Sequence, residues 1–289
     1  MKRKPPRRRS QWRLTLGFLL CLHAFSAQAW DWLPDDLQWN AGVGVAGAGY
    51  PAWRGASEAE SLVLPLPTFS VWTPQAEIGS EGLEAQKRFG AHGLLRFSAS
   101  GSLPVDSDAS ALRTDMPDLD PTVELGPALG WRSAQYGPWH WRAETLLRGV
   151  MSVDFEQPQW LGWTLQPRVA LHWRSGVVSS QQAIRARVAV GPIWAQQKLH
   201  AYFYDVPAEL ATAQRPAFRS RGGYNGTRAN FSLDWLQGRL LVSGYVGYDD
   251  LRGTAFADSP LRPEDQYWLI GSFMSWRFWG PPRPIDLES

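Results

Sequence analysis

The sequence predicts an all-β protein, a transmembrane antiparallel β-barrel of about twelve strands, with ten as the alternative. Residues 139–151 and 161–174 alternate between apolar and polar side chains along their whole length. A period of two indicates a strand, and a soluble strand is usually only about five or six residues long. A tilted strand that crosses a bilayer needs about nine to eleven residues. The 17 tryptophans suit the aromatic girdles of such barrels. A Trp-rich β-sandwich or sugar-binding domain is the alternative.

Residues 1–29 read as a secretory signal peptide, with a basic start, an apolar run from Leu14 to Phe25, and a small-x-small site ending at Ala29. Cleavage is expected between Ala29 and Trp30. The single cysteine, Cys21, lies in this segment, so the mature chain has no thiol for a disulfide, a nucleophile or a metal site.

Cleavage also changes the charge of the protein. The whole chain has 29 basic and 27 acidic residues, and seven of the basic residues precede residue 30. The mature chain therefore carries 22 basic and 27 acidic residues, a net charge of −5. This excess of acid gives no support to a nucleic-acid partner.

The barrel is expected over residues 30–279, with a short periplasmic tail at 280–289. Short turns at 136–138 and 237–238 suit the periplasmic end, because an even strand number places both termini there. The polar segments 49–63, 102–120, 205–221 and 251–265 suit longer loops. The predicted strands are 38–48, 64–74, 76–86, 90–101, 121–134, 138–152, 160–174, 183–196, 198–204, 222–236, 239–250 and 266–279.

The alternation also predicts which side chains face lipid. In the strand at 138–152, Trp139, Trp141 and Leu147 face outward, and in the strand at 160–174 Leu161 and Leu165 do so. The strand at 183–196 has the opposite phase, with Ile184 and Val188 outward. The last strand places Trp268, Ile270, Met274, Trp276 and Phe278 on one face, the aromatic-ended pattern read by the barrel-assembly machinery.

The inward face carries an unusual number of charges for a strand surface. Its members are Arg96, Glu124, Arg132, His140, Arg142, Glu144, Arg148, Arg168, His172, Arg174, Arg185, Arg187, Arg228 and Asp234. Three interpretations stay open. The charges form ion pairs that fill a narrow barrel, they line a water-filled pore that favours anions, or they form a catalytic site.

Catalysis has the weakest support among these interpretations. His140 and Glu144 share one face but lie about 13 Å apart along the strand. His172 is expected on the neighbouring strand, near His140 or Arg142. No serine stands in a recognisable nucleophile context, and the four histidines of the mature chain show no metal-ligand spacing. We therefore expect no enzymatic activity, no metal and no cofactor.

Four ordered segments resemble the MipA/OmpV family of outer-membrane proteins. They are Tyr50–Ala56 with Leu64–Pro67, then Asp120–Pro127, then Tyr202–Val206 with Arg215–Phe218 and Gly222–Tyr224, and finally Leu251–Leu261 with Tyr267–Phe278. Trp53 and Ala56 stand where the family pattern has Tyr and Ser. The motif positions are Gly55, Pro67, Glu124, Gly126, Gly223, Asp258, Ser259 and Pro260. The last three also form a good turn starter.

The resemblance implies a barrel in the outer membrane of a Gram-negative bacterium, in contact with outer-membrane lipid and assembled by the barrel-assembly machinery. It also implies a scaffold role, because the best-known member bridges a lytic transglycosylase and a murein synthase. The alternatives are an anion-favouring small-solute channel, an adhesin, and an outer-membrane lipid or peptide hydrolase.

Overall fold

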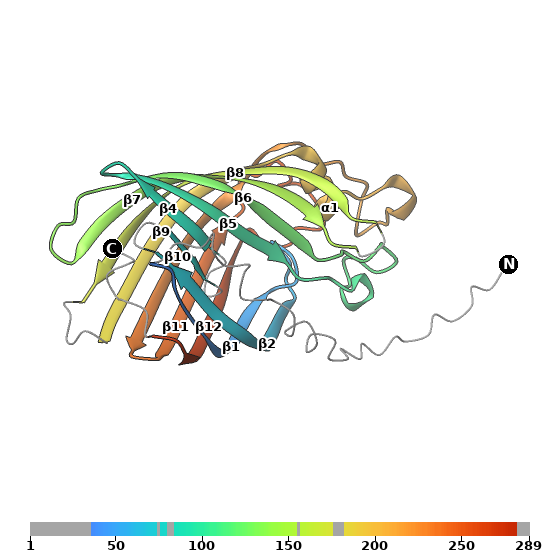
Figure 1. Ribbon diagram of the computed structural model, residues 1–289. Coiled ribbons are helices and arrows are strands. Elements are labelled where there is room, and N and C mark those ends of the chain that lie inside the picture. The colour runs from blue at the N-terminus through green and yellow to red at the C-terminus, as the bar shows by residue number, and fades with distance from the viewer. Residues whose placement is uncertain (1–35, 74–75, 80–83, 155–156, 176–181, 282–289) are drawn as a thin grey trace. The chain divides into compact units, whose positions relative to one another are not determined.

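A computed structural model shows a closed antiparallel barrel of twelve strands, in which β1 pairs with both β2 and β12 (Figure 1). The structure describes residues 36–73, 76–79, 84–154, 157–175 and 182–281. The predicted all-β barrel of about twelve strands is confirmed. The expected signal peptide, its Ala29–Trp30 cleavage site and the tail beyond residue 281 lie outside the described residues and stay predictions.

Most strands are long enough to cross a bilayer. They are β1 (Gln38–Pro51), β2 (Ala59–Trp72), β3 (Ala76–Gly79), β4 (Glu84–Phe89), β5 (Gly93–Ser102), β6 (Thr122–Arg132), β7 (Trp139–Ser152), β8 (Gln159–Arg174), β9 (Gln182–Ala195), β10 (Gly223–Gln237), β11 (Leu240–Asp250) and β12 (Gln266–Trp279). The helical elements are η2 (Ser107–Ala109), α1 (Gln197–Tyr204) and η3 (Ala208–Leu210). Among the residues that the structure describes, no helix has the length and apolar character of a membrane span.

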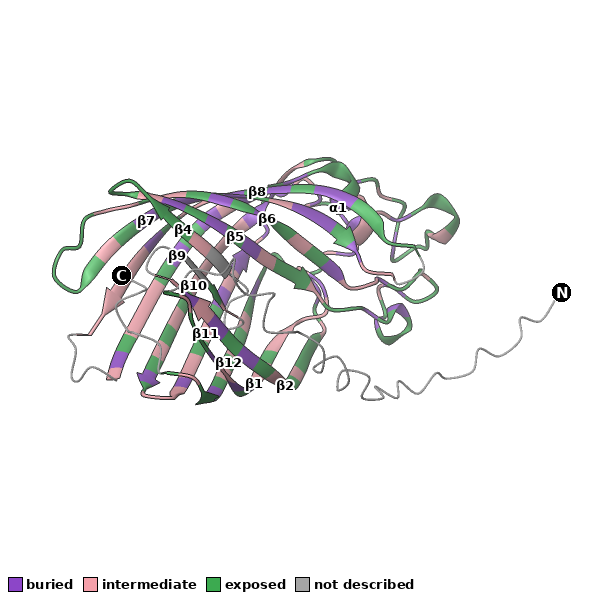
Figure 2. Ribbon diagram, in the orientation of Figure 1, coloured by how far each residue is buried: buried purple, intermediate pink, exposed green. Residues whose placement is uncertain are grey.

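Burial alternates along the strands, as period-two sequences require (Figure 2). On β7, Trp141 is 52% exposed on the outer face, whereas Leu146 is 1% exposed on the inner face. Exposed apolar residues continue around the barrel, for example Leu129, Val188 and Ile270. The outer surface is therefore apolar and the inner face carries the charges.

Two predicted strands are wrong, and the errors cancel in the strand count. Residues 76–86, predicted as one strand, contribute to two short strands, β3 and β4, which pair with each other. β3 ends at Gly79, and glycine is a residue type that ends a strand readily. Residues 198–204, predicted as a strand, belong to the helix α1, whose buried residues Leu199, His200 and Tyr204 share one side.

Leu161 is a third correction, because it is buried (1% exposed) rather than turned to lipid. The register between β7 and β8 shifts at Val150/Met151, so that Trp160 and Gly162 find partners and Leu161 is the extra residue of a β-bulge. Gly162 has a φ of +117° at this point, a conformation that favours glycine.

The even number of strands places the start of β1 and the end of β12 at one end of the barrel, named here the termini end. The hairpin turns near Gly137 and Gly238 lie at this end. Four longer segments lie at the opposite end, the loop end: 52–58, 103–121, 196–222 and 251–265. We call these four segments the cap. Because β1 and β2 extend beyond their predicted bounds, the first loop is shorter than the predicted 49–63.

Candidate functional site

The middle of the inner wall holds a buried carboxylate between two arginines. Glu144 on β7 accepts hydrogen bonds from Arg96 Nη1 at 2.6 Å and from Arg168 Nε at 2.7 Å. Glu144 and Arg168 are direct cross-strand partners, whereas Arg96 reaches across β6 from β5. Arg96 and Glu144 are 2% and 4% exposed, so the pair satisfies the rule that buried charges need partners.

Two further ion pairs link neighbouring strands on the inner face. Arg148 lies 3.5 Å from Glu124 and also donates from Nε to Ser98 Oγ at 3.1 Å. Arg185 lies 3.4 Å from Asp234, its direct partner across β9 and β10. In this part of the inner wall, the charges therefore form ion pairs, as the first of the three interpretations expects.

Toward the termini end the inner wall is mostly basic. His140 and His172 are direct cross-strand partners, and their rings stack with centroids 4.5 Å apart and planes 15° apart. The predicted approach of these two histidines is therefore present. Arg132 lies opposite Arg142, and Arg174 lies opposite Arg185. Such neighbours favour anions and provide neither an acid nor a nucleophile beside the imidazoles.

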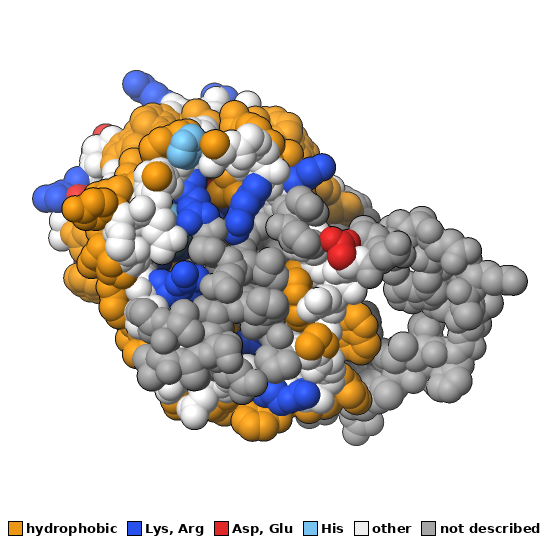
Figure 3. Space-filling model, turned by 60° about the vertical axis from the view of Figure 1, so that its left-hand side comes forward, with side chains coloured by type: hydrophobic (Ala, Val, Ile, Leu, Met, Phe, Trp, Pro, Cys, Tyr) orange, Lys and Arg blue, Asp and Glu red, His pale blue; other side chains and the backbone are white. Residues whose placement is uncertain are grey.

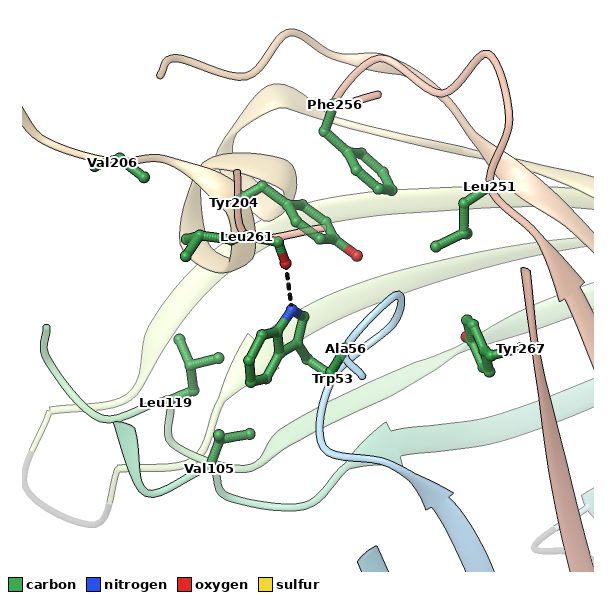
Figure 4. Close-up of a cluster of buried hydrophobic side chains, with 10 residues drawn as sticks. All are labelled: Trp53, Ala56, Val105, Leu119, Tyr204, Val206, Leu251, Phe256, Leu261 and Tyr267. Carbon is green, nitrogen blue, oxygen red and sulfur yellow. Dashed lines mark hydrogen bonds between the residues drawn. The ribbon is translucent and has the colours of Figure 1, made fainter. Parts of the chain in front are cut away.

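The cap encloses a hydrophobic cluster in which all four loops take part (Figure 4). Its buried members are Trp53, Ala56, Val105, Leu119, Tyr204, Val206, Leu251, Phe256, Leu261 and Tyr267. Tyr204 and Phe256 stack with ring centroids 3.7 Å apart. Trp53 Nε1 donates to the carbonyl oxygen of Leu261 at 2.7 Å, which joins the first loop to the last.

A charged group lies beneath this apolar cluster. Asp249, which is fully buried, accepts hydrogen bonds from Arg228 at 2.6 and 2.7 Å, from Arg54 at 3.1 Å, and from the hydroxyl of Tyr267. Burial alone would lower the pKa of Arg54, but the carboxylate of Asp249 outweighs that effect and raises the pKa above its usual range. Arg54 therefore stays charged, and through its bond to Asp249 the first loop is anchored to β10 and β11.

Two more arginines fasten the loop 103–121 to the loop 196–222. Arg215 Nη1 donates to the carbonyl oxygens of Leu112 at 2.9 Å and Thr114 at 3.0 Å. Arg113 donates to the carbonyl of Phe203 at 3.2 Å and stacks on Trp53 with its guanidinium 5.7 Å from the ring centroid. Burial lowers the pKa of Arg113 to about 10. Both arginines take backbone carbonyls as acceptors, so the contacts hold the loops in place.

The family-motif residues divide between the cap and the strands. Gly55 has a φ of +85° and lies within the first cap loop. Ser259 Oγ donates to the carbonyl of Tyr204 at 2.8 Å and accepts from the amide of Leu261 at 3.2 Å, so the Asp258–Pro260 segment forms part of the packed cap. The other motif residues lie on strands: Pro67 on β2, Glu124 and Gly126 on β6, and Gly223 on β10.

Sequence reasoning gave no structural role to the residues that assemble the cap, although several of them lie in the family-like segments: Trp53, Arg54, Arg113, Tyr204, Arg215, Asp249 and Tyr267. Their contacts join segments that lie far apart in the chain, such as Arg215 and Leu112, which are 103 residues apart. The one available signal was the charged Asp249 at an inward position of β11, opposite Arg228. In the part of the chain that the structure describes, no group of three or more His, Cys, Asp or Glu residues could hold a metal ion.

In a comparison with known protein families, the sequence matches the model of one family. The sequence model of that family, described as MltA-interacting protein MipA, matches residues 43–278. No curated protein matches the chain.

Several solved barrel structures overlap with the chain at low similarity. LpxR from Salmonella typhimurium is 8% identical, with a TM-score of 0.38 over 82% of this chain and 100% of that chain. The Pseudomonas putida toluene transporter TodX is 10% identical, with a TM-score of 0.33 over 84% and 89%. A Pseudomonas aeruginosa FadL homologue is 7% identical, with a TM-score of 0.27 over 85% and 91%. Overlap at this level carries no conclusion about function.

Proposed function

This chain belongs to the MltA-interacting protein MipA family, and we propose that it is a non-enzymatic docking protein of the Gram-negative outer membrane. Its partners in this proposal are peptidoglycan-remodelling enzymes, a lytic transglycosylase and a murein synthase. The name of the family supports the proposal, because it describes an interacting protein.

The outer surface supports a location in a membrane. Apolar side chains face outward on strand after strand, as Trp141, Leu165 and Trp276 do at 52%, 41% and 53% exposure. A soluble barrel would expose polar groups on this face, whereas lipid is the solvent in which an apolar outer band is stable. In the proposed orientation, the outer band contacts outer-membrane lipid, the termini end faces the periplasm and the cap faces outward.

The observation that carries the docking proposal is the packing of the cap. Its core residues Leu251, Phe256 and Leu261 are fully buried (0% exposed), and hydrogen bonds from Trp53 and Ser259 join the loops. A packed cap does not favour passage of solutes through the barrel. The termini end, with its exposed hairpin turns, then provides the surface that a periplasmic partner would meet.

The absence of enzymatic activity is part of the proposal. His140 and His172 are the inner-wall histidines, and the charges acting on His140 come from Arg88, Arg132, Arg142 and Arg174. A hydrolase would instead need an acid to orient the imidazole and a nucleophile beside it. Purified protein should not hydrolyse phospholipid, lipopolysaccharide or peptide. Turnover that disappears in His140→Ala or His172→Ala, with folding intact, would contradict this.

Site-specific crosslinking in living cells tests the docking surface. A photo-crosslinking amino acid is placed at Tyr136, which is 87% exposed in the turn between β6 and β7 at the termini end. The matched control carries the same probe at Glu209, which is exposed on η3 in the cap. We expect the Tyr136 probe to capture a lytic transglycosylase or a murein synthase and the Glu209 probe to capture neither.

The rival functions give different results in the same cells. Capture of an external ligand at Glu209, with no cell-wall enzyme at Tyr136, would overturn docking in favour of adhesion. If both probes capture only the assembly machinery, the docking proposal also fails.

A further inference from the structure

The barrel wall has an opening in its loop-end half, between β2 and β5, because the two strands that separate them are short. β3 pairs with residues 70–72 of β2, and β4 pairs with residues 93–98 of β5. Gly79 and Glu84 pair with each other, so the hairpin of β3 and β4 turns back at this level. Among the described residues, 59–66 of β2 therefore have ladder partners on β1 alone. We call this opening in the wall the window.

Contacts within the cap bound the window at the loop end. Ser110 Oγ donates to Glu58 Oε1 at 2.8 Å, so the loop 103–121 meets the loop 52–58 there. β2 and β5 form the two sides, and the hairpin of β3 and β4 forms the remaining boundary. At the level of that hairpin two strands separate β2 from β5, so their backbones lie about 14 Å apart along the wall, at about 4.8 Å for each spacing. The window is therefore a bounded opening in a barrel that still closes at the termini end.

Three leucines of β2 face the interior beside the window. Leu62, Leu64 and Leu66 lie on the same face of β2 as Ser70, which is fully buried. An inward leucine elsewhere on the wall is packed, as Leu94 on β5 is at 3% exposure. Leu64, in contrast, is 42% exposed, and Leu62 and Leu66 are only partly buried. The interior beside the window therefore has space next to an apolar wall.

Small residues on β1 leave this wall uncovered. Opposite Leu62, Leu64 and Leu66 stand Ala48, Ala46 and Gly44, none of which has a side chain larger than a methyl group. Apolar surface that stays in contact with water is unfavourable, and contact with hydrocarbon removes that cost. The three leucines with the two alanines are named here the leucine patch.

The free edge of β2 is unsuited to binding another strand. Pro65 lies in the window and Pro67 at its border, and they stand opposite Val45 and Val43 of β1. Proline cannot donate to a ladder, so within a sheet its nitrogen faces away from the hydrogen-bonded neighbour. Both nitrogens therefore face the side of the window, and a strand added there would lack two donors. An occupant that needs no hydrogen bonds fits this edge better.

The outer face on both sides of the window is apolar. Val63 on β2 is 71% exposed and Phe97 on β5 is 48% exposed. They continue the apolar outer surface, which Figure 3 shows along the rim of the barrel. On the inner face of β5, Ser100 is exposed, so the space inside the window is accessible to water. Unpaired backbone at membrane depth is tolerated where it lines such a space. In a bilayer, the window therefore connects the interior with lipid.

We propose that the window admits an acyl chain of a lipid from the surrounding bilayer, and that this chain binds against the leucine patch. Hydrocarbon requires no hydrogen bonds from the proline-containing edge, and it covers the leucines that the chain itself leaves exposed. The inference rests on the proposed location in a membrane, but it requires no cell-wall enzyme. A test in vesicles that contain no partner protein therefore separates it from the docking proposal.

Quenching of a fluorophore by brominated lipid tests the site. The full chain with Cys21→Ser carries one thiol-linked fluorophore at Leu64→Cys and is refolded into phosphatidylcholine vesicles with or without bromine on the acyl chains. Matched probes are placed at Val63→Cys, on the outer face of the same strand, and at Ser232→Cys, on the inner face of β10.

Bromine quenches a fluorophore only on close contact, so the three probes report where acyl chains reach. We expect the Leu64 probe to be quenched almost as strongly as the Val63 probe and several-fold more strongly than the Ser232 probe. If the Leu64 probe is quenched no more than the Ser232 probe, acyl chains do not reach the leucine patch and the proposal is overturned.

A further variant separates a chain inside the barrel from a fluorophore that reaches out through the window. Leu66→Asn makes the leucine patch polar and should reduce the quenching of the Leu64 probe by up to about tenfold, because one leucine no longer contributes apolar contact to the chain. Val63→Asn changes the outer face and should leave that quenching unchanged. Unchanged quenching in Leu66→Asn would mean that the fluorophore itself reaches the bilayer, and it would overturn the proposal. If Leu66→Asn does not refold, Leu62→Asn changes the same patch and the same reduction is expected.

Discussion

Trp53 joins the first and last loops of the cap through one buried hydrogen bond, from its indole N–H to the carbonyl oxygen of Leu261. Trp53→Phe keeps a ring but leaves that carbonyl buried without its donor. We expect a loss of about 1–3 kcal/mol in the free energy of unfolding, measured by urea denaturation in detergent. Trp141→Phe changes the same side-chain type on the exposed outer face and should have a much smaller effect. Equal losses would show that the bond does not stabilise the cap.

His200 makes the stability of the cap depend on pH. Its side chain is 1% exposed, and Nδ1 lies 2.6 Å from the carbonyl oxygen of Arg221, so Nδ1 carries the proton. Burial lowers the pKa of His200, because the charged form loses its hydration. The unfolded state, with a pKa of about 6.5, therefore binds a proton before the folded state does. The stability contribution is present above that value and is lost as the pH falls toward the lower folded pKa.

Limited proteolysis measures this effect. The loop 196–222 of the wild type should become easier to cleave as the pH falls below about 6.5. His200→Gln has no titrating group at this position and should show a smaller change over the same range. An identical pH response in the two proteins would assign the change to another residue.

Single residues also show how far the sequence could be interpreted. The inward positions of Arg142, Glu144 and Arg168 were predictable, because a period of two assigns each residue of a strand to a face. The contacts of Arg113 and Arg215 were not predictable, because they depend on where two loops meet in space. Most of the inner wall therefore follows from local pattern, whereas the cap depends on tertiary contacts.

At the level of the strands, Gly126 marks a point where β6 and β7 approach closely. A Cβ atom at Gly126 would lie 2.0 Å from the carbonyl oxygen of Leu147, whereas nothing lies within 4 Å of a Cβ atom at Gly244 on β11. Gly126→Ala should cost about 1–3 kcal/mol through overpacking, and Gly244→Ala should change stability by less than about 0.5 kcal/mol. Denaturation midpoints compare the two. Similar midpoints would contradict the close approach.

The two faces of β8 should respond differently to a change of charge. Leu165 faces outward, so Leu165→Arg places a charge toward lipid and should cost about 2–4 kcal/mol if it lies near the bilayer midplane. Arg168→Leu on the inner face should insert into membranes, although it leaves Glu144 with Arg96 as its remaining arginine partner. Membrane yield and heat-modifiable migration on gels measure assembly. Equal assembly of both variants would contradict the assigned faces.

The helix α1 shows why one element was misassigned. Residues 198–204 contain three consecutive aromatic residues, Tyr202 to Tyr204, a composition enriched in strands. In the cap, however, this segment packs Leu199, His200 and Tyr204 inward from a short helix. Tertiary packing therefore decided its structure, and composition alone could not reveal it.

For the whole molecule, the packed cap predicts that the barrel does not conduct. Planar-bilayer recordings of the purified wild type should show no steady current. The channel alternative predicts an anion-selective current whose selectivity reverses in Arg142→Glu, because that residue lies on the inner wall. A steady current of this kind would show that the barrel is an open pore and would contradict the prediction.

The pairing of β1 with β12 has a consequence for how the protein is made. Residues near both ends of the described chain, such as Gly42 and Arg277, are partners in one ladder. Contacts so distant in sequence form slowly, because the chain must close a long loop before it gains them. Until β12 is in place, β1 and β11 present unpaired edges that invite aggregation. We therefore expect the nascent polypeptide to be most prone to aggregation in the interval before its last strand has been delivered.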